Sequence, residues 1–132
     1  MADTPTVESY TPQTFPRDWG QEVFIAETPH YLGKILHMHA GTKGGLQYHV
    51  DKDETFHLWS GRAWVRTVVD GQIVQTLMMS GESFHVPPGA IHQVEAITPC
   101  TFFETSTPHY NDRVHVEDQF GLPEAGGLPT TR

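Results

Sequence analysis

The chain has 132 residues, 16 of them acidic and 8 basic, so its formal net charge is −8 with neutral histidines. This charge argues against nucleic-acid or anionic-membrane partners, and no apolar run approaches the roughly 20 residues of a membrane span. The single cysteine, Cys100, excludes an internal disulfide. Together with an N-terminus that lacks an apolar leader, it predicts a cytoplasmic protein. The length fits one domain.

Short apolar or alternating runs between turn signals recur along the chain, which is typical of an all-β protein. The predicted strands are 22–28, 31–40, 45–50, 54–60, 62–69, 72–79, 82–86, 91–97 and 99–106. Asp70-Gly71 joins two of them as a two-residue hairpin, because both residues tolerate a positive φ. The Pro- and Gly-richer ranges 1–20 and 108–132 are predicted as arms around a domain of residues 21–107. Strands of this length favour a β-sandwich or small barrel.

The first candidate site segment runs through Gln47, His49 and Glu54. Side chains alternate along a strand, so Gln47 and His49 point the same way. Glu54 opens the next strand on the face of apolar Phe56 and Leu58, which predicts an inward carboxylate. A buried carboxylate is costly unless it is paired or binds a cation. One metal ion would satisfy all three polar side chains.

The second segment follows a Pro-Pro-Gly turn at residues 87–89 and begins a strand at His92. His92 shares the inward face with Val94 and Ala96, which makes it a fourth candidate ligand. Two imidazoles, one carboxylate and one amide oxygen suit zinc, iron, manganese or nickel. The alternative is a hydrogen-bonded polar network without metal. A single carboxylate leaves a divalent site positively charged, which favours Lewis-acid chemistry.

These two segments resemble the paired motifs of the cupin superfamily, with Gly61 closing the first and Gly81, Pro87 and Gly89 preceding His92 in the second. The resemblance implies a double-stranded β-helix, a jelly-roll-like barrel with one divalent metal inside. It also implies a homodimer. It does not imply a particular reaction, since one fold carries many functions.

Gln47 stands where most cupins have a histidine. With His49, Glu54 and His92 it is similar to the metal set of phosphomannose isomerases and related small sugar-isomerase-like cupins, which implies zinc. That resemblance gives Lys52 a functional role, whereas the alternative for Lys52 is a solvated turn lysine. In the tail, where those relatives carry arginines, this chain has His115 and Leu122, which argues against a phosphorylated or nucleotide-sugar substrate.

Glu104 is the second candidate acid or base, on a strand where Phe102, Glu104 and Ser106 share one face. Alternation alone leaves open which face is inward.

Alternation places the other central histidines away from the site. His57 lies opposite Glu54, and His37 and His39 lie opposite Leu36 and Met38. The same alternation turns Lys34 inward if those two apolar residues are core.

The leading hypothesis is a metal-dependent enzyme that isomerises or epimerises a small polyhydroxylated substrate, with Lys52 or Glu104 moving the proton. The alternatives are an iron- or manganese-dependent dioxygenase and a non-catalytic barrel that binds a sugar or another small molecule.

Overall fold

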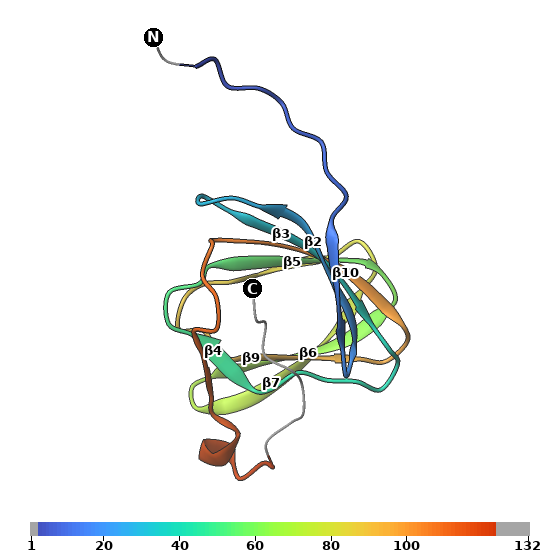
Figure 1. The fold of residues 1–132 in the computed structure, drawn as a ribbon. Helices are drawn as coiled ribbons and strands as arrows, with labels where there is room; N and C mark the ends of the chain where they lie inside the picture. Colours follow the sequence, from blue (N-terminus) through green and yellow to red (C-terminus); the bar gives the residue numbers. More distant parts are fainter. Residues whose placement is uncertain (1–2, 124–132) are drawn as a thin grey trace.

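The computed structural model describes residues 3–123, and two antiparallel sheets account for nearly all of its regular structure (Figure 1). One sheet has the strand order β1-β2-β3-β10-β5-β8 and the other β11-β4-β9-β6-β7. The strands are β1 (Gln13–Arg17), β2 (Gly20–Glu27), β3 (Leu32–Met38), β4 (Gln47–His49), β5 (Glu54–Ser60), β6 (Arg62–Val69), β7 (Gln72–Met79), β8 (Ser83–Val86), β9 (His92–Ala96), β10 (Cys100–Ser106) and β11 (Arg113–His115). A 3₁₀ turn, η1, covers Glu117–Phe120.

The sheets face one another across an apolar core, so the all-β, jelly-roll-like barrel is confirmed (Figure 1). Alternate residues of each strand fill this core. Phe56 and Leu58 contribute from β5, Ala63 and Val65 from β6, and Phe102 from β10.

The predicted hairpin is present. β6 and β7 pair in register up to Val69 opposite Gln72, and the turn residues Asp70 and Gly71 have φ of 51° and 75°. Both values lie in the left-handed region that this two-residue turn requires.

Two strands lie inside the ranges predicted as arms. β1 pairs with β2, and Pro16 fits there because β1 is an edge strand, where a missing N–H is tolerated. β11 pairs with β4. Part of each range predicted as an arm therefore contributes to a sheet, and β11 borders the strand that carries Gln47 and His49. The division of the chain at residues 20 and 107 remains a prediction.

Candidate metal centre

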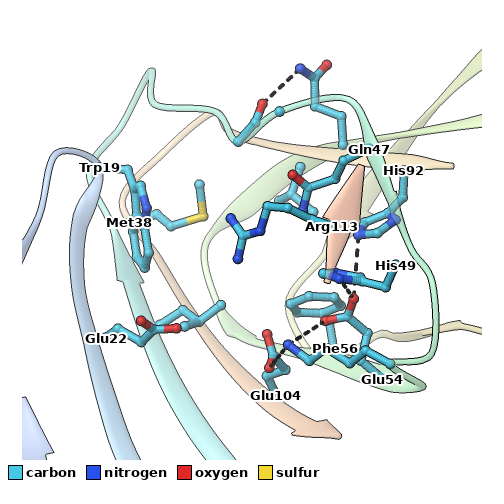
Figure 2. Close-up of a pocket in the computed structure, with 16 residues that line it drawn as sticks. Trp19, Glu22, Met38, Gln47, His49, Glu54, Phe56, His92, Glu104 and Arg113 are labelled. Carbon is cyan, nitrogen blue, oxygen red and sulfur yellow. Dashed lines mark hydrogen bonds and ion pairs between the residues drawn. The ribbon is translucent and has the colours of Figure 1, made fainter. Parts of the chain in front are cut away.

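Three candidate ligands converge at the wall of one cavity (Figure 2). β4 runs beside β9 with Gln47 opposite His92, and His49 follows on the same face of β4. Glu54 is the first residue of β5 in the other sheet. His49, Glu54 and His92, here called the ligand cluster, are buried and offer ligand atoms that lie within 4.8 Å of one another.

Hydrogen bonds donated by Nδ1 orient both imidazoles of the ligand cluster. His49 Nδ1 lies 2.9 Å from Asp112 Oδ1, and His92 Nδ1 lies 3.0 Å from the Ala90 carbonyl oxygen. Because these oxygens accept hydrogen bonds, each Nδ1 carries the proton. In the neutral ring, Nε2 then holds a lone pair. Burial lowers the pKa of His92 despite the nearby Glu54 charge, which favours that neutral form.

The Nε2 atoms both face the carboxylate of Glu54. His49 Nε2 lies 2.8 Å and His92 Nε2 3.6 Å from Glu54 Oε2. This oxygen and the Gln47 amide oxygen are buried without a hydrogen-bond partner. Buried hydrogen-bond acceptors without a donor are unfavourable. Carboxylate and amide oxygens, and imidazole Nε2 atoms whose rings are oriented through Nδ1, are however ligands for a divalent cation. The residues present therefore fit a metal ion.

Lys52 and Glu104 lie beside the ligand cluster. The Lys52 side chain is buried, with its Nζ 3.1 Å from Glu104 Oε2 and 3.6 Å from Glu54 Oε1. The reading of Lys52 as a solvated turn lysine is therefore wrong: two carboxylates draw its ammonium inward from the turn before β5. Glu104 is inward with Phe102 and Ser106, which settles the face that alternation left open.

The Lys52–Glu104 pair continues into a row of buried charges. Lys34 Nζ lies 3.6 Å from Glu104 Oε2 and 3.1 Å from Glu22 Oε2, and Arg17 pairs with Glu22 at 2.8 Å. We call this row the ion-pair chain. In the order of their contacts, its members are Arg17, Glu22, Lys34, Glu104, Lys52 and Glu54.

The ion-pair chain keeps both candidate catalytic groups charged. Burial alone would lower the pKa of the Lys52 ammonium, but the charges of Glu104 and Glu54 outweigh it and leave the pKa above its ordinary value. Burial would raise the pKa of Glu104, but Lys34 and Lys52 lower it to about 2. Lys52 is therefore protonated in this structure and can act as a proton donor or as a positive charge. Glu104 is ionised and is a weak base.

The other central histidines, His37, His39 and His57, lie where alternation predicts. His37 is on the outer face of β3, within hydrogen-bond distance of Thr101, and His39 is exposed beyond the end of that strand. His57 reaches Ser83 across the outer face of β5. Lys34 is turned inward and almost completely buried, as expected from Leu36 and Met38.

A cavity of about 120 Å³ opens onto the ligand cluster. Polar side chains of the cluster and the ion-pair chain form one part of its wall. Apolar side chains form another, namely Trp19, Leu36, Met38, Phe56 and Val94. At this size it holds roughly ten water-sized atoms, so it fits a small organic molecule.

Three polar residues of the site were not predicted from the sequence: Glu22, Asp112 and Arg113. Glu22 lies two residues before the apolar Phe24 and shares its buried face of β2, and this spacing could have identified its inward face. Asp112 and Arg113 lie in a range predicted as an arm. There the only local signal is the short alternation of Val114 and Val116 with polar neighbours.

The barrel is similar in fold to parts of several solved structures. The capsular polysaccharide assembling protein CapF from Staphylococcus aureus matches with a TM-score of 0.72 and 19% identity over 82% of this chain and 32% of CapF. KdgF from Halomonas sp. matches with a TM-score of 0.63 and 19% identity over 78% of this chain and 90% of KdgF. Oxalate decarboxylase from Bacillus subtilis matches with a TM-score of 0.71 and 16% identity over 92% of this chain and 38% of the enzyme.

At these identities the likeness concerns the fold alone, and this chain spans about a third of CapF. No curated protein sequence matches the chain. Among the described residues, no helix has the length and apolar character needed to cross a membrane.

The sequence profile of the cupin domain matches residues 34–110, more than half of the chain. The match runs from β3 to just beyond β10 and includes every residue of the ligand cluster. Two facing antiparallel sheets and a cluster of inward histidines and glutamate agree with it. The chain therefore belongs to the cupin family.

Proposed function

We propose that the protein is a metal-dependent enzyme that moves a proton next to a carbonyl group of a small polyhydroxylated substrate, as in isomerisation or epimerisation. The observation that carries this proposal is the buried Lys52 ammonium, 3.1 Å from Glu104 and 3.6 Å from Glu54 of the ligand cluster. A buried charged acid beside a metal-type cluster and a small cavity is an arrangement suited to acid–base chemistry.

Gln47, His49, Glu54 and His92 are the residues we assign to the metal, with zinc as the expected ion. Bound there, a divalent cation would supply Lewis-acid polarisation of a substrate carbonyl. The support for Gln47 is its buried amide oxygen without a hydrogen-bond partner.

Lys52 and Glu104 are the residues we assign to proton movement. Lys52 donates its proton to the substrate carbonyl oxygen, and Glu104 accepts the proton that leaves the neighbouring carbon. Glu104 is a weak base while Lys34 and Lys52 both hold it at a pKa of about 2. Its basicity rises once Lys52 has become neutral, because one of the two cations that stabilise the carboxylate is then gone.

Replacement of Lys52 by methionine tests this assignment. We expect Lys52→Met to lower aldose–ketose conversion at least 100-fold, the usual scale of acid–base catalysis, while the zinc content of the purified protein is unchanged. Lys43→Met is the matched control, because Lys43 is exposed. Elemental analysis gives the metal content, and a panel of three- to six-carbon aldoses and ketoses gives the activity.

Three results would contradict the proposal. Full activity of Lys52→Met would remove the role of Lys52. Substrate-dependent oxygen uptake by an iron- or manganese-loaded protein, without isomerisation, would favour the dioxygenase. Ligand binding without turnover, whichever metal is supplied, would favour a binding protein.

The homodimer and the cytoplasmic location remain predictions. Light scattering would check the oligomeric state, and cell fractionation would check the location.

A further inference from the structure

The six-stranded sheet turns an uncharged face to the outside of the barrel, here called the outer sheet face. The charged residues of its strands are the members of the ion-pair chain other than Lys52, which lie on the inner face, and Glu27. Glu27 lies opposite the buried Leu32, and residues paired in this way share a face. The outward side chains of these strands therefore include no Asp, Glu, Lys or Arg, although the whole chain has a net charge of −8.

Apolar side chains form a row across the middle of the outer sheet face. Val23 lies opposite Ile35, and Ile35 lies opposite Phe103, so three adjacent strands contribute one residue each. On β5, the next strand, the Trp59 ring centroid lies 5.5 Å from that of Phe103, and Trp59 is 62% exposed. Ile25 on β2 is exposed as well. An apolar, aromatic patch without charges is typical of the core of a protein interface.

The lack of charge on the outer sheet face favours a second copy of this chain as its partner. Two copies that each carry a net charge of −8 repel one another wherever their acidic surfaces meet, and this face is where that repulsion is small. The face has no carboxylate or ammonium that would attract a charged partner of another kind. A two-fold axis through it places the apolar row of one copy against that of the other.

Residues 3–12, here called the N-terminal arm, extend away from the barrel on the side of the six-stranded sheet (Figure 1). Tyr10 fixes the base of the arm, because its hydroxyl donates a hydrogen bond to the Ile25 carbonyl oxygen at 2.7 Å. Further along the arm, the apolar side chain of Val7 is completely exposed. At about 3.3 Å per residue the arm reaches about 33 Å, so it can pass the edge of a second barrel stacked on the outer sheet face and lie against its side.

The outer sheet face and the arm together provide the area that a stable dimer needs. Six strands about 4.8 Å apart, with about six residues of about 3.3 Å each, cover roughly 600 Å². A standard interface buries about 800 Å² on each partner. The sheet thus supplies most of this area, and the arm supplies the remainder.

We propose that the protein forms a two-fold symmetric dimer in which the outer sheet faces of two copies pack together and each N-terminal arm lies against the partner's barrel. The cupin resemblance implies a homodimer but no interface, and these two features provide one. Trp59 and Phe103 form its centre, where aromatic side chains contribute most to affinity. The inference goes beyond the proposed function and uses no residue of the ligand cluster.

Sedimentation velocity of the full chain over a range of concentrations tests the interface. We expect the wild type to be a dimer. Trp59→Glu should raise the dimer dissociation constant at least 100-fold, because each dimer loses two aromatic contacts and gains two facing carboxylates. Leu77→Glu is the matched control, because Leu77 is 43% exposed on β7 of the other sheet. It should dimerise as the wild type does.

Val7→Asp tests the arm without touching the barrel. Because Val7 is completely exposed in the single chain, its replacement leaves the packing of the fold unchanged, and any change in dimer affinity comes from contact with the partner. We expect a dissociation constant at least tenfold higher. Circular dichroism confirms that the Trp59 and Val7 variants are folded.

A wild-type chain that stays monomeric at every concentration would overturn the inference and leave the outer sheet face to a different protein. A dimer weakened by Leu77→Glu but not by Trp59→Glu would also overturn it, because the interface would then lie on the other sheet. Unchanged affinity of Val7→Asp would overturn the role of the arm. Failure of the proposed function would show as missing turnover and would leave these dissociation constants as they are.

Discussion

Asp112 joins two parts of the candidate site through one carboxylate. Its Oδ1 accepts the hydrogen bond of His49 Nδ1, and its Oδ2 accepts those of the backbone N–H groups of Asp51 and Lys52. Burial would raise the pKa of Asp112, but these hydrogen bonds and His49 lower it. One ionised side chain thus fixes the ring orientation of a ligand and the turn that carries Lys52.

Replacement of Asp112 should therefore weaken metal binding. We expect Asp112→Asn to reduce zinc affinity about 10- to 100-fold, the usual effect of losing a carboxylate behind a ligating histidine. Asp112→Ala should reduce it further, because the turn hydrogen bonds are also lost. Zinc competition with a chromophoric chelator measures the affinity, with exposed Asp118→Asn as the control. Equal affinities of the Asp112 variants and the wild type would show that Asp112 does not position His49.

At the scale of the elements, the turn between β5 and β6 depends on close packing at Gly61. Its φ of +108° is a conformation that side chains disfavour, and a Cβ there would lie 2.4 Å from the Pro99 carbonyl oxygen and 2.8 Å from Cys100 Sγ. The next residue, Arg62, donates its N–H to Thr98 Oγ1 at 3.0 Å. The glycine that closes the first motif is therefore needed where the β9–β10 turn packs against the start of β6.

Gly61→Ala should destabilise the fold without affecting the ligands directly. We expect a loss of about 2–3 kcal/mol from backbone strain, together with a fall of about 10 °C in Tm. Thermal unfolding of the metal-free protein measures both. Gly44→Ala is the matched control, because a Cβ there meets nothing within 4 Å. A Tm of Gly61→Ala equal to that of the control would mean that the turn adjusts at little cost.

For the whole molecule, local pattern was enough to predict nine strands, the Asp70-Gly71 hairpin and the inward face of β5. It also placed Glu54 and His92 on inward faces, because apolar residues on the same face of each strand mark the core. For Gln47 and His49 it predicted only a shared face, and the resemblance to cupin motifs implied their role. The buried state of Lys52 was not predictable in this way. It lies in a turn without alternation, and carboxylates 2 and 52 residues away in the chain hold it.

The same limit explains the residues that were missed. Asp112 meets His49 across 63 residues of sequence, and β11 has only three residues in which to show a pattern. β1 contains a proline, which argues against a strand unless it lies at a sheet edge. Sequence pattern thus identified the ligand cluster, whereas the polar groups that orient it are set by long-range pairing.

The ion-pair chain gives the whole fold a pH dependence that can be measured. The pKa of Glu104 is lowered from 4.5 to about 2 in the folded protein. A group with a depressed folded pKa contributes stability that is fully present above its unfolded pKa and is lost as pH falls toward the folded value. The contribution of Glu104 should therefore be complete above about pH 5 and disappear between about pH 4.5 and pH 2.

Urea unfolding of chelator-treated protein between pH 7 and pH 2.5 tests this dependence. We expect Glu104→Gln to be less stable than the wild type at pH 7, because Lys34 and Lys52 lose a shared carboxylate. The difference between the two proteins should shrink as pH falls below 4.5, since the wild-type carboxylate then takes up a proton. Glu8→Gln, at an exposed position, should follow the wild type throughout. Parallel stability curves for Glu104→Gln and the wild type would mean that Glu104 is not held ionised by the two lysines.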